Sequence, residues 1–364
     1  MKSSRVFSLA CAVALAVSAA HAAAPFHIYA PSPSTKQLWI VAAQPTDAGL
    51  SLSVASKVDL GFEGGTIAAH PDKPVLYIAA GGGKAGEVPA AVVTLEAVGG
   101  YGKHEAVKLQ HGSAYLSIDR TGRFLLSADY GSGAVDVYAL NEAGVPGARV
   151  AGVAEGRKTA HGVLATPDNR FVYVPYVKES NALLQYRFDA TTGQLTPLEP
   201  KDAAPPPATG PRHLAYHPKL STVYFSNEQQ LGVSVYDRAE SGQLTIRQVA
   251  DALPASESKE GLSSSDIVIT PDGRFLFAGI RGHSRPINAI ARYRIQDNGE
   301  VALLGLTPAD KIPWGFALSP DGAYLVVTAY EGATLTAYRI GEAGDLTRAA
   351  SLACDKNISD VVTR

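Results

Sequence analysis

The sequence predicts an all-β fold, a single seven-bladed β-propeller with four strands in each blade. Three observations carry this prediction. An element made of an apolar strand, a turn and a second apolar strand recurs six times along the chain. Further segments of strand character follow each copy, and the two ends of the chain hold complementary parts of a seventh blade.

The recurring element has a turn whose proline, or Arg120 in one copy, serves as its marker. Successive markers are separated by 49, 47, 51, 53 and 49 residues, which is the length of one propeller blade. Alternating segments such as 134–138 and 335–338 follow and supply the outer strands. A helical solenoid would need apolar spacings of three and four, and a β-sandwich would not need this period. The markers are Pro71, Arg120, Pro167, Pro218, Pro271 and Pro320.

The two ends of the chain supply the seventh blade together. Residues 26–29, 38–41 and 50–54 have the pattern of second, third and fourth strands without a first strand. The segment 359–362 resembles 265–268, which belongs to a first strand. We therefore expect the C-terminal residues to pair with the N-terminal strands and close the ring, which removes open sheet edges.

The first residues have the composition of a secretory signal peptide. Lys2 and Arg5 precede an apolar run over 6–20, which small residues follow at 20–24. The run is shorter than the roughly 20 residues needed to span a bilayer, and no later segment is long and apolar enough to do so. We predict a signal peptide over 1–22, a propeller domain over 23–364, and a periplasmic or secreted protein without membrane insertion after cleavage.

Composition limits the class of partner. The formal net charge is -2, and cleavage would make it -4, with charges of both signs mixed along the chain. This pattern excludes nucleic acid and anionic lipid as expected partners. Only Cys354 would remain after cleavage, so no intramolecular disulfide is expected and this thiol is interpreted as a packing residue. We expect the mature chain to act as a monomer.

Catalytic motifs of the usual local kind are absent from the sequence, so the candidate site follows from repeat geometry. In a propeller, residues just before the first strand and just after the second strand lie at the same mouth of the channel. Six residues before each marker the chain has Gly65, Ala114, His161, Arg212, Ser265 and Trp314. Ten residues after each marker it has Gly81, Tyr130, Val177, Glu228, Arg281 and Tyr330.

Four ionisable residues from three successive blades thus converge on one mouth: His161, Arg212, Glu228 and Arg281. Two arginines suit an anionic substrate, while a glutamate or a histidine can transfer protons. The alternative is structural, with Arg212 and Glu228 forming an ion pair that bridges two blades, and with Arg281 and His161 as solvated residues at the rim.

Further residues are assigned around this group. Tyr130, Trp314 and Tyr330 are candidate walls of a substrate site, and His213 is a candidate substrate-binding residue, although its place at the rim leaves its role undecided. His111 and His283 also lie near the rim, and their roles are likewise undecided. We interpret the two turn histidines of the repeat as structural. They are His70 and His217.

Five segments carry further motifs, namely 128–133, 210–213, 226–228, 269–276 and 281–283. Together they resemble the motifs of the seven-bladed propeller lactonases, a family that includes propeller-type 6-phosphogluconolactonases and fungal carboxy-cis,cis-muconate cyclases. The resemblance implies a seven-bladed fold and, from the muconate cyclases, an active-site set that matches His161, Arg212, Glu228 and Arg281. The chain departs from the family at three positions, namely Val268 for a histidine, Ile280 for an asparagine and Trp314 for an arginine.

Together these observations predict an exported enzyme that hydrolyses, or reversibly forms, a small anionic or sugar-derived lactone. The expected partner is a small-molecule lactone or organic acid, and no metal or organic cofactor is required. The alternative is a non-catalytic periplasmic ligand-binding or scaffold propeller. Glu228→Gln distinguishes the two, because it should abolish hydrolysis in an enzyme and alter only affinity or stability in a binding protein.

Overall fold

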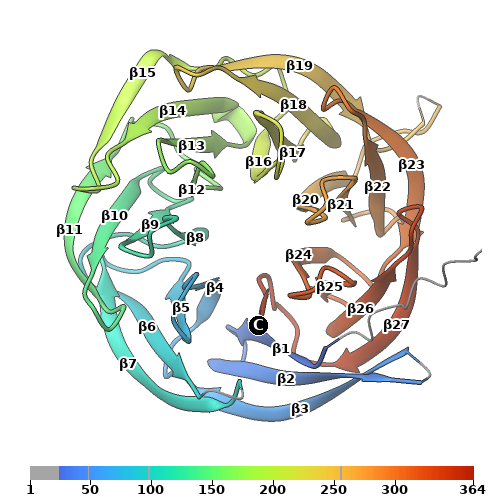
Figure 1. Ribbon diagram of the computed structural model, residues 1–364, viewed down its shortest axis with the longest axis horizontal. Coiled ribbons are helices and arrows are strands. Elements are labelled where there is room, and N and C mark those ends of the chain that lie inside the picture. The colour runs from blue at the N-terminus through green and yellow to red at the C-terminus, as the bar shows by residue number, and fades with distance from the viewer. Residues whose placement is uncertain (1–23, 48, 97–98, 255) are drawn as a thin grey trace, which may run out of the picture.

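Seven antiparallel sheets of four strands each stand in a ring around a central channel in the computed structural model (Figure 1). The structure describes residues 24–364 except 48, 97–98 and 255. The predicted propeller with seven blades is therefore confirmed. The predicted signal peptide lies outside the described residues.

Each blade runs from an inner strand beside the channel to an outer strand at the rim. The first two complete blades consist of β4 (Gly64–Ala69), β5 (Val75–Ala80), β6 (Val88–Leu95) and β7 (Tyr101–Leu109), then β8 (Tyr115–Ile118), β9 (Phe124–Ala128), β10 (Val135–Leu140) and β11 (Pro146–Val153). The third and fourth blades consist of β12 (Leu164–Ala165), β13 (Phe171–Tyr176), β14 (Ala182–Phe188) and β15 (Leu195–Asp202), then β16 (Pro211–Tyr216), β17 (Thr222–Asn227), β18 (Gly232–Arg238) and β19 (Leu244–Asp251). The fifth and sixth blades consist of β20 (Leu262–Ile269), β21 (Phe275–Gly282), β22 (Ala289–Ile295) and β23 (Val301–Pro308), then β24 (Pro313–Leu318), β25 (Tyr324–Ala329), β26 (Thr334–Ile340) and β27 (Leu346–Ala353). The seventh consists of β28 (Val362–Thr363), β1 (Phe26–Ser32), β2 (Gln37–Thr46) and β3 (Gly49–Asp59), and one short 3-10 helix, η1 (Lys178–Ser180), follows β13.

The seventh blade joins the two ends of the chain, as the sequence predicts. In the short strand β28, Val362 pairs with Tyr29 of β1. Beside it, the backbone groups of His27 and Arg364 exchange two hydrogen bonds of 2.6 and 2.9 Å. Pairing of the C-terminal residues with β1 supplies the inner strand of this blade and closes the ring.

The turn between the first two strands of a blade is built by the residue before the marker. In the fifth blade the Thr270 hydroxyl oxygen accepts a hydrogen bond of 3.1 Å from the backbone N–H of Phe275. In the fourth blade the Nδ1 atom of His217 accepts backbone N–H bonds, and its Nε2 atom donates to the carbonyl of Gly273 in the next blade. His70 makes the equivalent bonds to Gly122, so both turn histidines have structural partners.

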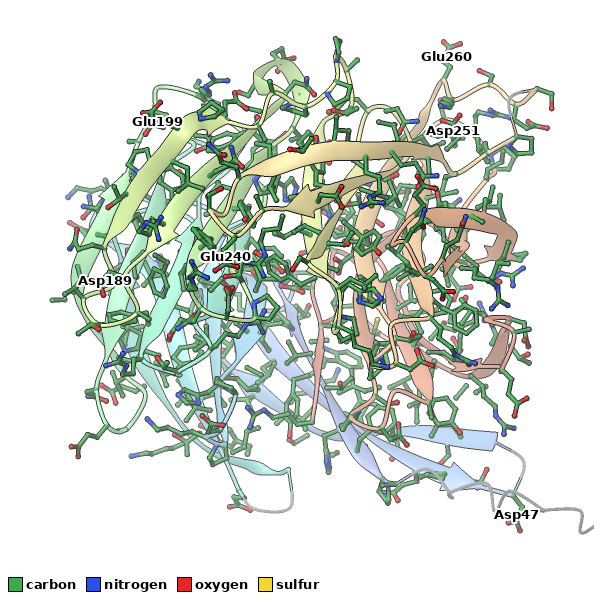
Figure 2. All side chains as sticks on the ribbon, turned by 45° about the horizontal axis from the view of Figure 1, so that its top comes forward. Asp47, Asp189, Glu199, Glu240, Asp251 and Glu260 are labelled. Carbon is green, nitrogen blue, oxygen red and sulfur yellow. The ribbon has the colours of Figure 1, made fainter. Side chains whose placement is uncertain are left out.

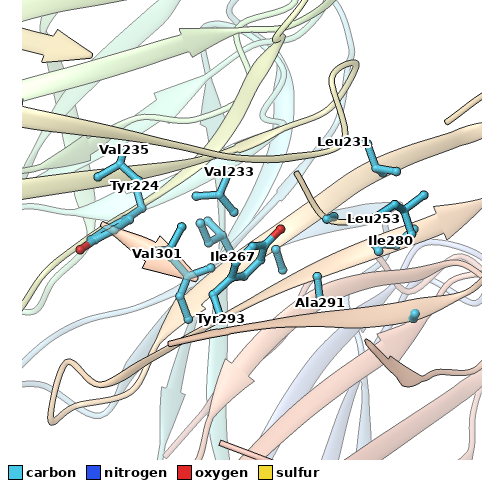
Figure 3. Close-up of a cluster of buried hydrophobic side chains, with 14 of the residues drawn as sticks. Tyr224, Leu231, Val233, Val235, Leu253, Ile267, Ile280, Ala291, Tyr293 and Val301 are labelled. Carbon is cyan, nitrogen blue, oxygen red and sulfur yellow. The ribbon is translucent and has the colours of Figure 1, made fainter. Parts of the chain in front are cut away.

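The hydrophobic core is divided among the interfaces between neighbouring blades. Figure 3 shows one interface, where Val233 and Val235 of the fourth blade face Ile267 and Tyr293 of the fifth blade. These side chains are nearly inaccessible to solvent, because the alternating residues of each sheet pack against the next sheet. The ring is thus held by repeated side-by-side packing of blades.

Bulges in the inner strands shape the channel. Between Pro211 and Leu214 of β16, one extra residue interrupts the pairing with β17. The same irregularity occurs in β20 between Ser264 and Ile267, and in β24. A bulge alters which way successive side chains point, so residues adjacent in sequence can both lie beside the channel.

Several acidic side chains lie exposed on the outer surface. Figure 2 shows Asp189, Glu199 and Glu240 on the outside of the ring and Asp47 at a distant hairpin, and all four are exposed. No helix within the described part of the chain is long and apolar enough to cross a membrane.

Candidate active site

One mouth of the channel opens into a cavity of about 520 Å³. It is formed where the inner strands begin and the second strands end, which is where the repeat geometry predicted it. Most of the residues six before and ten after the markers line this cavity. The larger polar and aromatic side chains in its wall are Tyr130, His161, Lys178, Glu228, Ser263, Arg281, His283, Trp314 and Tyr330.

A carboxylate bound by two guanidinium groups forms one side of the cavity. The Oε2 atom of Glu228 lies 3.0 Å from Nε of Arg212 and 3.1 Å from Nη2 of Arg281. Arg212 is completely buried behind Glu228 and does not line the cavity, whereas Arg281 does. Arg281 also donates a 2.7 Å hydrogen bond to the carbonyl oxygen of Ser264. The group therefore presents Glu228 and Arg281 to a ligand, with Arg212 as their support.

Local backbone structure explains why these three side chains meet. Arg212 lies in the bulge of β16, Glu228 directly follows β17, and Arg281 lies near the end of β21 in the next blade. The carbonyl of Glu228 also accepts a backbone hydrogen bond from Ser264 of β20. Arg212 and Glu228 belong to the same blade, so their ion pair does not bridge blades as the structural alternative supposed. The buried side chain of Arg281 connects the group to the next blade.

His161 lies at the same mouth with one ring nitrogen buried. Its backbone N–H donates to the carbonyl of Pro175, which fixes the segment before β12. Its Nδ1 atom is buried without a hydrogen-bond partner, and the side chain lines the cavity, so Nε2 is the nitrogen on the cavity side. Burial lowers the pKa of His161 well below its ordinary value near 6.5, and the charge of Arg212 lowers it further. The imidazole is therefore neutral at neutral pH.

His213 lies behind His161, toward the opposite end of the channel. The two imidazole rings are 5.1 Å apart between centroids, and His213 lines a second cavity of about 460 Å³ inside the channel instead of the mouth cavity. Its Nδ1 atom is 2.7 Å from Oδ1 of Asp266. The structure therefore does not bring this predicted substrate-binding residue into the lining of the mouth.

Aromatic rings form another wall of the mouth cavity. Trp314 and Tyr330 lie 4.6 Å apart between centroids, with an angle of 30° between their planes. The guanidinium carbon of Arg281 lies 4.4 Å from the centroid of Trp314, which is cation–π distance. Tyr130 is edge-on to His161 with centroids 5.4 Å apart. The three predicted wall aromatics therefore all lie at this mouth.

Two polar features of the mouth were not predicted. Lys178 begins η1 with a positive φ of 53°, and its Nζ lies 5.4 Å from the ring centroid of Tyr130. Interaction with Tyr130 raises the pKa of this lysine. Ser263 lies 2.7 Å from Nε2 of His283, which places one of the undecided histidines in the cavity wall. Lys178 directly follows a repeat position occupied by Val177, which is the signal that could have revealed it.

The remaining candidates have other surroundings. The Nδ1 atom of His111 lies 2.8 Å from the buried carboxylate of Asp136, outside the mouth cavity. Cys354 packs beside the core between the sixth and seventh blades, and burial raises the pKa of its thiol to about 12. Among the residues that the structure describes, no group of three His, Cys, Asp or Glu side chains is arranged to hold a metal ion.

Comparisons with known proteins identify relatives of the chain. The profile of the family described as "Lactonase, 7-bladed beta-propeller" matches residues 33–360. A 6-phosphogluconolactonase of Cronobacter sakazakii is 30% identical over 327 residues, which cover 87% of this chain and 92% of the relative. One from Enterobacter is 29% identical over 316 residues, covering 86% and 91%. The structure of a periplasmic gluconolactonase of Pseudomonas aeruginosa superimposes with a TM-score of 0.79 and 19% identity, covering 93% of this chain and 99% of that one.

Proposed function

Because the chain belongs to the lactonase family of seven-bladed β-propellers, we propose that it hydrolyses a small sugar-derived lactone at the mouth that contains His161 and Arg281. The observation that carries the proposal is that an imidazole and a guanidinium group line one cavity. Burial lowers the pKa of this imidazole, which favours its neutral form. Lactone hydrolysis needs a base to take a proton from water and a cation to stabilise the oxyanion. The two groups meet these needs without further components.

His161 is better suited than Glu228 to act as the base. The Oε2 atom of Glu228 accepts from both guanidinium groups, so this oxygen is already engaged. In contrast, the His161 side chain lines the cavity and its buried ring nitrogen is Nδ1, which leaves Nε2 on the cavity side. In our proposal His161 activates water, Arg281 stabilises the oxyanion, and Glu228 with Arg212 orients Arg281.

The aromatic wall favours a sugar ring in the same cavity. Trp314 and Tyr330 offer an apolar surface beside the charged groups, which suits the combination of C–H and hydroxyl groups on a sugar lactone. Lys178 and Arg281 add positive charge at the mouth, which also accommodates the carboxylate of the product. We further propose that residues 1–22 direct export, which favours an unphosphorylated lactone as the substrate.

The test is a proton-release assay with the purified mature protein on gluconolactone, 6-phosphogluconolactone, muconolactones and simple γ-lactones. We expect turnover of a sugar lactone above its spontaneous rate. His161→Gln should reduce kcat by about 100-fold or more, since general base catalysis contributes that much. Glu228→Gln should also lose turnover, because Arg281 is no longer oriented.

His104→Gln provides the matched control, because His104 is exposed on the outer strand β7 and should leave turnover unchanged. If folded wild-type protein hydrolyses no member of the panel, the enzyme proposal is wrong. Ligand binding without turnover would then favour the non-catalytic propeller. Turnover of muconolactones alone would show that the enzyme resembles the muconate cyclases in its substrate and not the sugar lactonases.

A further inference from the structure

Asp266 is held rigidly in the wall of the channel. Its Oδ1 atom accepts from the backbone N–H of Ile267 at 2.8 Å, and its Oδ2 atom accepts from that of Phe316 in the next blade at 2.8 Å. The bulge of β20 directs this carboxylate to the channel, and the two backbone bonds prevent it from turning. His213 adds a side-chain contact to the same carboxylate, with its Nδ1 atom 2.7 Å from Oδ1.

This contact defines the tautomer of His213. A carboxylate can only accept, so Nδ1 of His213 carries the hydrogen. Burial lowers the pKa of His213 well below 6.5, with further lowering by the charges of Arg212 and Arg281, so the ring is neutral. Its Nε2 atom is then a hydrogen-bond acceptor, and it is buried without a partner.

The neighbouring ring supplies the complementary atom. The His161 ring lies 5.1 Å from that of His213 between centroids, and its Nδ1 is likewise buried without a partner. A buried polar atom without a hydrogen-bond partner costs free energy. Since Nε2 of His213 is an acceptor, this cost is smallest when Nδ1 of His161 carries the hydrogen and can donate to it. His161 with its hydrogen on Nδ1 has its lone pair on Nε2, the atom on the cavity side.

We propose that Asp266 and His213 are positioning residues, which hold His161 in the tautomer whose Nε2 lone pair faces the mouth. This inference rests on the proposed lactonase function, in which His161 is the general base. Water attacks the lactone carbonyl carbon while Nε2 of His161 takes its proton. The proton then passes to the ring oxygen as its bond to the carbonyl carbon breaks. The hydroxy acid formed ionises and releases one proton to solvent.

Several charged and titratable groups face this chain of three residues. Arg212 and Arg281 lie on the mouth side, where they disfavour protonation of both histidines. Tyr115 contacts His213 edge to face with centroids 4.9 Å apart, and Asp360 lies across the channel. The negative charge of Asp266 offsets the two cations when His161 becomes an imidazolium, while Asp266 itself remains ionised.

The first test is Asp266→Asn with Asp360→Asn as its matched control. Asp360 stands at the same repeat position, and it accepts the backbone N–H bonds of Ile67 and Val361 in the same way, but among the described residues its side-chain hydrogen bond comes from the Thr66 hydroxyl and not from a histidine. Both variants lose a carboxylate from the channel wall. Only Asp266→Asn places an amide beside His213. If the amide NH2 donates to Nδ1 of His213, the hydrogen of this ring moves to Nε2, and the tautomer of His161 can reverse in turn. We expect kcat to fall by about 100-fold with KM changed less than about threefold, against a kcat within about twofold of wild type for Asp360→Asn.

A pH–rate profile adds a readout that a structural role would not change. In wild type the acid limb should follow protonation of Asp266, whose pKa burial raises to about 6, together with that of His161, whereas the residual rate of Asp266→Asn should lack the contribution of Asp266. His213→Gln should reproduce the loss in kcat, and it serves as the second variant if Asp266→Asn does not fold. A folded Asp266→Asn enzyme with wild-type kcat and pH profile would overturn the proposal.

The second test observes the tautomer directly and does not depend on turnover. In ¹⁵N-histidine-labelled protein, His161→Gln and His213→Gln assign the two rings, and ¹⁵N chemical shifts report which nitrogen is protonated. We expect His161 to carry its hydrogen on Nδ1 in wild type and on Nε2 in Asp266→Asn. A hydrogen on Nε2 in wild type, as when Arg212 donates to Nδ1, would refute the inference. Absence of turnover on every lactone, with the expected tautomer, would refute the proposed function alone.

Discussion

Asp266 and Asp360 occupy the same repeat position in the fifth and seventh blades, and each connects two neighbouring inner strands. Asp360 accepts the backbone N–H of Ile67, as Asp266 accepts that of Phe316. Burial raises the pKa of Asp266 to about 6 and that of Asp360 to about 7, against 3.8 for an ordinary aspartate. The folded protein therefore binds protons at these groups at a higher pH than the unfolded chain does.

This difference predicts that Asp360→Asn destabilises the protein more at pH 5 than at pH 8. Stability rises as pH falls wherever the folded state binds more protons, which for Asp360 is the range between about 7 and 3.8. The variant loses this gain, so its deficit in the free energy of unfolding should be about 2 kcal/mol larger at pH 5. Urea titrations of both proteins at the two pH values measure the difference.

Asp47→Asn is the control for this measurement, because Asp47 lies exposed at the end of β2 (Figure 2). It should change the free energy of unfolding little at either pH. A deficit for Asp360→Asn that is equal at both pH values, or larger at pH 8, would contradict the raised pKa of this carboxyl group.

At the scale of single residues, repeat spacing predicted which positions reach the mouth but not the direction of every side chain. Strand alternation assigns Arg212 and His213 to opposite faces of β16. The bulge between Pro211 and Leu214 changes this, so that Arg212 supports Glu228 while His213 faces the channel. A bulge leaves no clear mark in a single sequence, because it depends on how the partner strand is paired.

At the scale of elements, second strands are connected to outer hairpins of the next blade by tyrosine hydroxyl groups. Tyr77 of β5 donates 2.7 Å to the carbonyl of Gly144 in the hairpin between β10 and β11. Tyr224 of β17 donates 2.8 Å to that of Gly299 between β22 and β23. Burial raises the pKa of both hydroxyl groups, so they remain protonated donors.

We predict that Tyr77→Phe and Tyr224→Phe each lower the free energy of unfolding by about 1 kcal/mol or somewhat more. Each change leaves a glycine carbonyl at the blade interface without its donor, while the aromatic packing is retained. Chemical denaturation measures the effect. Tyr101→Phe on the partly exposed edge of β7 is the control and should be nearly neutral. Equal stability of all three variants would show that these hydroxyl groups do not stabilise the blade interfaces.

The elements themselves follow from the sequence more fully than the site does. Each strand pair is delimited by a turn whose residue before the marker bonds the backbone, as Thr270 and His217 do. Such local chemistry is visible in one sequence. The helix η1 is not, because Lys178 adopts a positive φ that nothing in its residue type favours. Its position depends on the surrounding blades, including the bond from its backbone N–H to Gln229.

At the scale of the whole molecule, the ring is closed by a very short strand. β28 has only two residues, yet Val361 beside it is buried against the core between the sixth and seventh blades. The sequence predicted this closure, because 359–362 resembles a first strand and the N-terminal segment lacks one. It could not predict how the channel divides into a cavity at the mouth and another behind His213, since that depends on side-chain packing across the ring.

Deletion of residues 361–364 should therefore lower Tm by at least about 5 °C. The truncated chain loses the pairing of β28 with β1, the backbone bonds between His27 and Arg364, and the buried side chain of Val361. These losses amount to several kcal/mol, which corresponds to such a shift in a domain of this size. Asp360 remains in the shortened chain and keeps its bond from the backbone N–H of Ile67, but it loses the bond from that of Val361. Thermal unfolding followed by circular dichroism measures the effect.

A circular permutant distinguishes ring closure from a general effect of losing residues. A short linker can join Arg364 to Pro25, because His27, two residues after Pro25, already pairs with Arg364. New termini between Thr191 and Thr192 lie in the exposed hairpin between β14 and β15, far from the mouth cavity. A covalent closure of the seventh blade should keep Tm within about 5 °C of wild type and retain turnover, because the ring and the mouth are unchanged. An unchanged Tm in the truncated chain would show that β28 contributes little to the stability of the ring. A lowered Tm in the permutant alone would show that the intact hairpin of the third blade stabilises the protein more than ring closure does.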